Sequence, residues 1–445
     1  MGVLMQAFYW DCPKIEQVEK GWWKRVSTEV SKLASAGFTA LWLPPAGKAA
    51  NIGGMSMGYD VYDYYDLGSF DQKGSRETWF GSETDLRALI KNAHDSRLKV
   101  YADMVLNHCN GADAEEVNLR DGQKRWTKFN PKSGKFTRDW TCFNPSPYTE
   151  DDPGAFGTMP DFCHINPRVS TNMLNIAKWL IEDVGYDGLR YDFVKGFASW
   201  IVRAIHDRIY QRGGQPVDIF GVGECWDQDE FIDAWLDSVN NWSNHRVGCF
   251  DFPLRYRLKD LCDSYGFSLR TLENPGVLVK ERPLEAVTFV DNHDFRGGDG
   301  GEEIILDKIL AYAYILTHEG YPCVFWKDYF RYGLGAPGLP TGIEALVKAH
   351  ENYAAGGTNN LWVDDVFYAM ERTGFGNQPG LVFALNNAGD TQTRQLHTRF
   401  RGQLKPVAWG DRSAALASQP VRLDADGNAQ VTVAPRSYIV LAPTG

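Results

Sequence analysis

The strongest constraint on the fold is a repeated alternation of short apolar segments with amphipathic helical segments. Eight apolar runs of strand length occur between residues 3 and 326, and the stretches between them carry the period of helices, as in residues 83–97. Strands that alternate with helices form parallel βαβ units. The pattern therefore predicts an α/β fold, a (β/α)8 TIM barrel with insertions. The candidate strands are residues 3–10, 39–45, 99–108, 188–194, 219–226, 248–254, 285–294 and 321–326.

Two departures from this alternation predict further domains. Residues 109–166 are rich in Gly, Pro, Asn and Asp and lack a helical period, which is typical of a functional insertion. After about residue 345 the runs "GLVFALNN", "AQVTVAP" and "SYIVLAP" indicate antiparallel strands of a β-sandwich. We therefore expect a barrel over 1–108 and 167–345, an inserted domain B over 109–166, and a C-terminal β domain over 346–445.

Charge and hydropathy exclude several classes of function. The 445-residue chain has a formal net charge of −11, and nucleic-acid binding requires a basic face. No apolar run approaches the roughly 20 residues of a membrane helix, and the first residues lack the basic start and apolar core of a signal peptide. We expect no nucleic acid and no membrane as partners, and a monomer.

The cysteines exclude a small disulfide-bonded or zinc-bound scaffold. All eight are scattered, and no CxxC pair occurs. Three of them lie in apolar strand-like runs and are expected to be buried thiols, namely Cys225, Cys249 and Cys323. The sequence leaves open a disulfide among three that lie in or beside the insertion, namely Cys109, Cys142 and Cys163.

Polar residues cluster at the ends of the candidate strands. In the run 188–194, Arg190 and Asp192 lie two residues apart and so point the same way from an otherwise apolar strand. Burying a charge costs several kcal/mol unless it is paired. The C-terminal ends of barrel strands meet at one mouth, so we expect Asp192 to converge there with Glu224 and Asp294. One such carboxylate alone would most often be a helix cap or a surface ion pair, but three with an arginine and two histidines indicate a site.

These residue types suit the hydrolysis of a glycosidic bond. An arginine keeps a neighbouring carboxylate ionised near neutral pH, so Asp192 beside Arg190 fits a nucleophile. Glu224 is flanked by Val222, Cys225 and Trp226, and we expect an apolar setting in which it retains a proton. An ionised carboxyl paired with a protonated one is the basis of glycoside hydrolysis.

Four motifs resemble those of the α-amylase family, glycoside hydrolase family 13. In chain order they are "DMVLNH" (103–108), "GLRYDFVKG" (188–196), "GECW" (223–226) and "FVDNHD" (289–294). Residues 58–82 are also similar to a segment of bacterial liquefying α-amylases, and residues 159–169 resemble the motif that closes the inserted domain in plant and bacterial α-amylases. The resemblance extends from residue 2 to about residue 330.

The resemblance implies a role for each matching residue. Asp192 would be the nucleophile, Glu224 the general acid and base, and Asp294 the residue that grips the distorted sugar. The remaining residues would bind substrate: Arg190, His108 and His293 at the sugar next to the scissile bond, Tyr59 stacked beneath that sugar, and Lys195 and Trp226 on the leaving-group side.

The resemblance also implies a structural calcium ion between the barrel and domain B. Its side-chain ligands would be Asn107, Asp151 and Asp161, with carbonyl oxygens near Gly154 and from Gly196. Oxygen ligands of this kind are what a hard cation requires. The alternative for Asp151 and Asp161 is turn formation in a loop rich in Pro and Gly.

The activity that this resemblance implies is that of an α-amylase, a retaining endo-hydrolase of α-1,4-glucosidic bonds. The substrates would be starch, amylose and maltooligosaccharides. A transglycosylase or a maltooligosaccharide-forming amylase of the same family would share the motifs, and a non-catalytic glucan-binding protein would share the fold. Because most microbes meet starch outside the cell, we expect a secreted protein, with the cytoplasm as the alternative.

Overall fold

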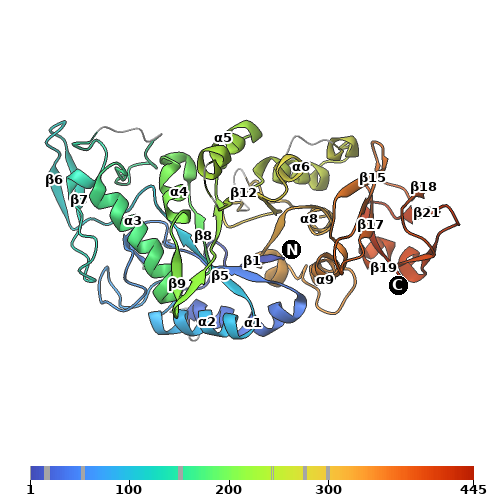
Figure 1. Ribbon diagram of the computed structural model, residues 1–445, viewed down its shortest axis with the longest axis horizontal. Coiled ribbons are helices and arrows are strands. Elements are labelled where there is room, and N and C mark those ends of the chain that lie inside the picture. The colour runs from blue at the N-terminus through green and yellow to red at the C-terminus, as the bar shows by residue number, and fades with distance from the viewer. Residues whose placement is uncertain are drawn as a thin grey trace. The chain divides into compact units, whose positions relative to one another are not determined.

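Eight parallel strands close into a barrel in which each strand neighbours the next one along the chain (Figure 1). The computed structural model describes residues 2–14, 21–51, 56–148, 154–241, 243, 245–273, 278–296 and 301–444. Each barrel strand falls within one of the eight apolar runs, so the predicted (β/α)8 barrel is confirmed. The strands are β1 (Leu4–Gln6), β2 (Ala40–Trp42), β5 (Lys99–Met104), β8 (Gly188–Tyr191), β11 (Phe220–Gly223), β12 (Gly248–Phe250), β13 (Ala286–Phe289) and β14 (Tyr321–Phe325).

Helices separate the barrel strands, and α2, α3 and α6 each begin after a residue whose side chain caps the first turn. Ser82 accepts a hydrogen bond from the Asp85 amide at the start of α2, and Asn166 caps α3 with Pro167 in its first turn. The α-helices are α1 (Gly21–Ala36), α2 (Glu83–Asp95), α3 (Pro167–Trp179), α4 (Trp200–His206), α5 (Asp229–Asn240), α6 (Phe252–Asp263), α7 (Leu278–Glu281), α8 (Ile309–Ile315) and α9 (Ile343–Tyr353).

The chain divides into two compact units. The first consists of Met1–Gln6, Ser35–Thr39 and Asp251–Gly445, and the second of Ala7–Ala34 and Ala40–Phe250. The second unit carries β2, β5, β8, β11 and β12, and the first carries β1, β13, β14 and the C-terminal sheets. The domain limits expected from the sequence stay a prediction.

In the second unit, the register of β5 and β8 matters most for the site. Asp103 on β5 pairs with Arg190 on β8, and Arg190 pairs in turn with Val222 on β11. All four residues of β8 are buried, as expected for a parallel strand covered on both faces. Three small antiparallel ribbons complete this unit: β3 (Lys48–Ala49) with β4 (Val61–Asp63), β6 (Ala114–Val117) with β7 (Lys124–Lys128), and β9 (Tyr210–Arg212) with β10 (Gln215–Val217).

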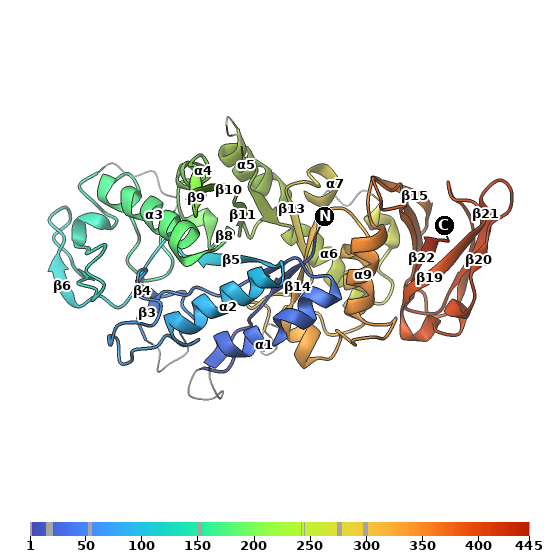
Figure 2. The same ribbon diagram turned by 60° about the horizontal axis from the view of Figure 1, so that its bottom comes forward.

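In the first unit, the C-terminal residues form two antiparallel sheets (Figure 2). Apolar side chains from both sheets share one core, as Val382 and Leu441 meet Leu396 and Val431. The predicted antiparallel C-terminal β domain is therefore confirmed. The larger sheet contains, in spatial order, β15 (Thr358–Val363), β16 (Phe367–Arg372), β17 (Leu381–Asn386), β22 (Ser437–Pro443), β19 (Gln403–Trp409) and β20 (Val421–Arg422), and the smaller contains β18 (Gln392–His397) and β21 (Asn428–Val433).

The cysteine side chains answer the question that the sequence left open. All eight lie among the described residues, and each is a buried thiol rather than half of a disulfide. This confirms the expectation for Cys225, Cys249 and Cys323, and it shows that the disulfide left open among the other three does not form. Cys142 and Cys163 meet instead through the backbone, where the Cys163 amide donates to the Cys142 carbonyl. Within the described ranges, no helix is both long and apolar enough to cross a membrane.

Candidate active site

The centre of the site is the buried guanidinium group of Arg190. Because side chains alternate along β8, Arg190 points to the opposite face of the strand from Leu189 and Tyr191. Arg190 Nη1 lies 2.8 Å from Asp103 Oδ1 and 2.8 Å from Asp192 Oδ1, and its Nη2 lies 2.7 Å from Glu224 Oε1. Arg190 is only 1% exposed. One planar cation therefore holds three carboxylates from neighbouring strands, two through Nη1 and one through Nη2.

Glu224 lies in a more polar environment than its sequence neighbours predict. Besides the ion pair with Arg190, its Oε2 accepts a hydrogen bond of 2.9 Å from the Phe193 amide. Phe193 adopts φ +43°, a left-handed conformation that is uncommon for a bulky residue and is found at functional sites. The expected apolar setting of Glu224 is wrong, because Arg190 on the adjacent strand reaches its carboxylate.

Asp103 is the member of the cluster whose part in the site the sequence did not reveal. Its Oδ2 accepts hydrogen bonds from Tyr59 Oη at 2.9 Å and Trp42 Nε1 at 3.1 Å. Burial raises the pKa of Asp103 to about 6, although Arg190 and the Tyr59 hydroxyl oppose the rise. In the sequence, Asp103 was visible as a charged strand-end residue that opens the 103–108 motif, and the strand register was needed to place it against Arg190.

Aromatic rings line the site beside Arg190. The rings of Trp10 and Tyr59 stack with centroids 6.2 Å apart, and those of His108 and Phe156 stack with centroids 4.9 Å apart. The Tyr59 ring lies 5.8 Å from the Arg190 guanidinium carbon. Phe156 is 45% exposed, so a flat apolar surface is open to a ligand. Sugar rings stack on surfaces of this kind, and neither Trp10 nor Phe156 was predicted to belong to the site.

His108, one of these stacked rings, is held as a neutral imidazole. Its Nε2 lies 3.0 Å from the Tyr59 carbonyl oxygen. Burial lowers the pKa of His108 to about 4, while the bond to Tyr59 opposes that change. A neutral ring that donates Nε2–H to this carbonyl fixes both the ring and the backbone of Tyr59.

Lys195 and Trp226, both expected on the leaving-group side, lie next to each other. Lys195 belongs to the short helical turn η3 (Val194–Gly196) that follows β8. Its Nζ donates to the Trp226 carbonyl oxygen and lies 3.0 Å from Asp227 Oδ2. The structure therefore brings these two predicted residues together.

His293 and Asp294 belong to the first unit, at the end of β13. His293 Nδ1 lies 2.9 Å from Gln6 Nε2 on β1, and His293 Nε2 lies 3.4 Å from Asp294 Oδ2. The Asp294 amide donates to Asn292 Oδ1 at 2.8 Å. Because these residues and the Arg190 cluster belong to different units, the convergence of the three carboxylates stays a prediction.

Three of the residues expected to bind calcium lie together in the second unit. The Phe162 amide donates to the Asn107 carbonyl at 2.9 Å, and His108 pairs with Asp161 in a β-bridge. Asn107 is fully buried, and its Oδ1 has no hydrogen-bond partner among the residues described. A Cβ atom at Gly196 would lie 2.3 Å from that oxygen. A buried amide oxygen next to a carboxylate-bearing segment fits a hard cation. The fourth predicted ligand, Asp151, lies outside the described residues.

A second acidic group is filled by a cation of the chain itself. Ligand oxygens of Asp291, Glu303 and Asp328 all lie within 4.8 Å of one another, close enough to hold a metal ion. However, Lys308 Nζ lies 2.8 Å from both Asp291 and Asp328. The ammonium group occupies the position that a metal ion would take.

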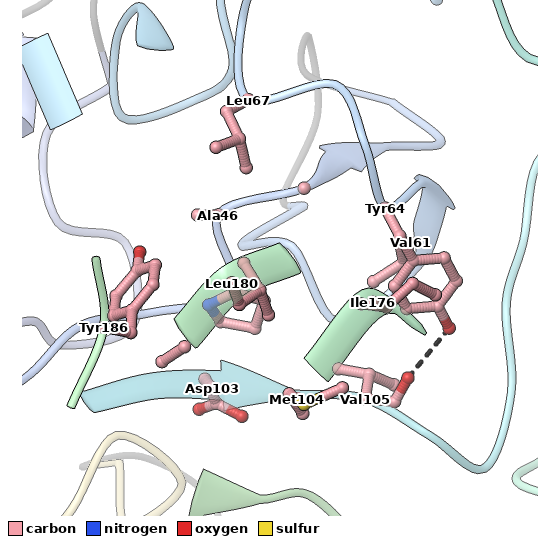
Figure 3. Close-up of a pocket in the computed structure, with 13 residues that line it drawn as sticks. Ala46, Val61, Tyr64, Leu67, Asp103, Met104, Val105, Ile176, Leu180 and Tyr186 are labelled. Atoms are coloured by element: carbon pink, nitrogen blue, oxygen red, sulfur yellow. Dashed lines mark hydrogen bonds between the residues drawn. The ribbon is translucent and has the colours of Figure 1, made fainter. Parts of the chain in front are cut away.

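A small cavity behind β5 is not the substrate site (Figure 3). It has a volume of about 20 Å³ and is lined by apolar side chains such as Met104 and Leu180, with Asp103 at its edge. Tyr64, which also lines it, donates a hydrogen bond of 2.8 Å to the Val105 carbonyl. The volume suits a single water molecule and is too small for a sugar.

Comparisons with known proteins point to one family. The family described as alpha amylase, catalytic domain, matches residues 14–218. The alpha-amylase of Geobacillus stearothermophilus is 31% identical over 99% of this chain and 87% of its own length. The glucan 1,4-alpha-maltohexaosidase of Bacillus sp. (strain 707) is 31% identical over 96% and 89%, respectively. The crystal structure of the Geobacillus thermoleovorans alpha-amylase complexed with acarbose has a TM-score of 0.71 at 21% identity, covers 99% of this chain and 97% of its own, and supports the fold.

Proposed function

This chain belongs to the α-amylase family and is a glycoside hydrolase of the α-amylase type, and from that premise we propose that it cuts internal α-1,4-glucosidic bonds of starch with retention of configuration. Amylose and maltooligosaccharides are the corresponding smaller substrates. The observation that carries the proposal is the clamp in which Arg190 holds both Asp192 and Glu224 at 2.7–2.8 Å.

The clamp suits a double displacement. Retaining enzymes place their two carboxyl groups about 5–5.5 Å apart, and a shared guanidinium keeps the two groups close. Asp192 attacks the anomeric carbon, and Glu224 gives a proton to the leaving oxygen and later takes one from water. The cluster has one cation for three carboxylates, and neighbouring like charges favour uptake of a proton. That excess of negative charge supports one proton held within the cluster, which the mechanism requires on Glu224 when the leaving oxygen departs.

The surrounding residues support binding of one sugar beside the bond that is cut. Tyr59 and His108 offer a ring face and a fixed imidazole in the second unit. Lys195 and Trp226 would contact the leaving group. Asp294 and His293 would grip the distorted sugar from the first unit.

Calcium would be held by Asn107, Asp151, Asp161 and Gly196 and would tie domain B to the barrel. Among the residues that the structure describes, the buried Asn107 Oδ1 has no hydrogen-bond partner, which supports this proposal. When bound, the ion would supply structural cohesion rather than a reacting group. Asn107 directly precedes His108, so the same segment would carry both the ion and a substrate contact.

A second candidate function is the release of maltooligosaccharides of fixed length. The maltohexaosidase of Bacillus sp. is as similar to this chain as the G. stearothermophilus alpha-amylase, at 31% identity. A time course of products from soluble starch would separate the two activities. A broad early size distribution supports internal cleavage, and one dominant oligosaccharide from the start supports the second candidate.

The test of the catalytic assignment is a set of three isosteric variants. Asp192→Asn, Glu224→Gln and Asp294→Asn should each lower kcat by several orders of magnitude, because each removes transition-state stabilisation. Asp218→Asn is the control, since its side chain is 93% exposed. Starch hydrolysis at the parental rate in any of the three would remove that residue from its role.

Stereochemistry tests the nucleophile separately. NMR of the first products should show the α-anomer before mutarotation, because two inversions restore the configuration. An initial β-anomer would refute retention and the role of Asp192.

We propose that the enzyme acts as a monomer outside the cell. The alternative of a cytoplasmic enzyme is supported by eight buried thiols, since thiols persist in reducing compartments. It is also supported by a relative named cytoplasmic alpha-amylase, from Escherichia coli (strain K12), which is 28% identical over 88% of this chain and 90% of its own length. Fractionation of the native host, with starch-degrading activity measured in each fraction, decides between the two.

A further inference from the structure

A buried cluster of charges lies at the end of β13, in the unit that carries Asp294. It contains equal numbers of carboxylates and cations, which the catalytic cluster around Arg190 does not. The six members are Asp291, Glu303, Asp328, Arg255, Lys308 and Lys327. Asp291 directly follows Val290 at the end of β13, three residues before Asp294.

Lys308 is the centre of this cluster. Its Nζ lies 2.8 Å from Asp291 Oδ2, 2.8 Å from Asp328 Oδ1 and 3.4 Å from Glu303 Oε1, and the side chain is 7% exposed. The three carboxylates come from separate parts of the chain: the end of β13, the segment before α8, and the helical turn η5 (Lys327–Arg331) after β14. One ammonium group therefore joins three segments.

The cluster also holds the backbone that leads to the proposed catalytic residue. Arg255 Nη2 lies 2.6 Å from Asp291 Oδ1, and Arg255 Nε donates to the Val290 carbonyl at 3.2 Å. The Ile304 amide donates to Asp291 Oδ2 at 3.1 Å. On the other side, Tyr312 Oη donates to Asp328 Oδ2 at 2.6 Å. Together with Arg255 and the Ile304 amide, Lys308 thus restricts the Asp291 carboxylate to a single position.

We propose that Lys308 is a positioning residue, an internal cation that stands in the place of a metal ion and fixes the segment carrying His293 and Asp294. The proposal rests on the role of Asp294 proposed above. Lys308 acts through Asp291 and touches no substrate. Without its charge, three buried carboxylates would face two cations, and mutual repulsion would move the end of β13.

The first test replaces the cation with a neutral chain of similar length. Lys308→Met should lower kcat at least tenfold while KM for a maltooligosaccharide changes little, since Asp294 is expected to act mainly in the transition state. Lys348→Met is the control, because Lys348 is 50% exposed and pairs with Glu344 on α9. The control should match the parent in both constants.

The Asp294→Asn variant separates failure of this inference from failure of the proposed function. If Asp294→Asn is inactive and Lys308→Met has the parental kcat, the positioning role is refuted. If Asp294→Asn itself retains activity, the catalytic assignment fails instead, and with it the basis of this inference.

The second test is chemical rescue of Lys308→Ala with methylammonium. The shortened side chain leaves space between the three carboxylates, and a small ammonium ion can supply the missing charge. Methylammonium chloride should raise kcat several-fold, whereas sodium chloride at equal ionic strength should not. If the variant is unfolded, recovery of the folded state by methylammonium alone supports the role. No recovery of activity or folding by methylammonium would refute it.

Discussion

The contacts of Arg190 with three carboxylates predict that replacing its guanidinium group lowers stability and kcat in graded steps. Lysine keeps the positive charge but places it on one nitrogen of a shorter side chain, so it loses at least one of the contacts that Nη1 and Nη2 now make with different carboxylates. Methionine removes the charge altogether. We expect stability and kcat to fall in the order parent, Arg190→Lys, Arg190→Met.

The magnitudes follow from the number of contacts that each change removes. Arg190→Lys loses at least one charge-assisted hydrogen bond, a cost of about 1.5–3 kcal/mol. Arg190→Met leaves buried carboxylates without their cation, a cost of about 3–5 kcal/mol. For a domain of a few hundred residues these costs lower Tm by about 3–12 °C and 6–20 °C respectively. Because Asp192 and Glu224 both lose their orientation, kcat should fall at least about 100-fold even with lysine.

The assay combines thermal unfolding with starch hydrolysis at a temperature where all variants are folded. Arg125→Lys is the matched control: Arg125 Nη2 lies 2.6 Å from Asp121 Oδ2 and its side chain is 36% exposed, so the same change should cost less than about 1 kcal/mol and leave kcat unaltered. A parental Tm and kcat in Arg190→Lys would refute the argument that the clamp needs a fork.

Three further predictions concern other parts of the chain. EDTA should lower the Tm and the activity of the parent, and calcium should restore both, because an ion that binds only the folded state adds about 2.7 kcal/mol to the free energy of unfolding at 100 times its Kd. An Asp161→Ala variant that responds to EDTA like the parent would contradict the assignment of Asp161 as a calcium ligand. Lys48→Met should cost about 3–5 kcal/mol of stability, because the buried Lys48 Nζ binds the carbonyls of Ser75, Arg76 and Glu77 at 2.7–3.0 Å. Lys91→Met, at a site 75% exposed, is the control and should change Tm little. Equal decreases of Tm in the two variants would contradict a stabilising role for the Lys48 contacts. Burial raises the pKa of Asp328 to about 6, although Lys308 opposes the rise, so the folded state binds a proton more tightly than the unfolded chain does and stability falls as pH rises from about 4 to 6. Over that range the parent should lose up to about 3 kcal/mol of stability relative to Asp328→Asn. Denaturant melts that show the opposite trend would exclude the raised pKa of Asp328.

Local patterns were sufficient for the architecture. The period of two in "GLRYDFV" and the helical period between apolar runs predicted all eight barrel strands. Because parallel strands end at the same edge, the same patterns predicted that Arg190 and Asp192 would lie beside Glu224, and the ion pairs of Arg190 agree. The alternation of apolar residues after residue 345 predicted the C-terminal sheets. These properties depend on residues that are near one another in the sequence.

The partners of the buried charges could be learned only from the tertiary structure. Asp103 lies 87 residues from Arg190 in sequence, and strand register alone brings them to 2.8 Å. That register also replaced the expected apolar setting of Glu224 with an ion pair. Lys308 was not predicted at all, since its three carboxylates come from segments with no shared motif. A sequence pattern specifies which face of a helix or strand is buried. Which charged group pairs with a buried charge depends on how distant elements pack, because electrostatic energy depends on separation in space and not along the chain.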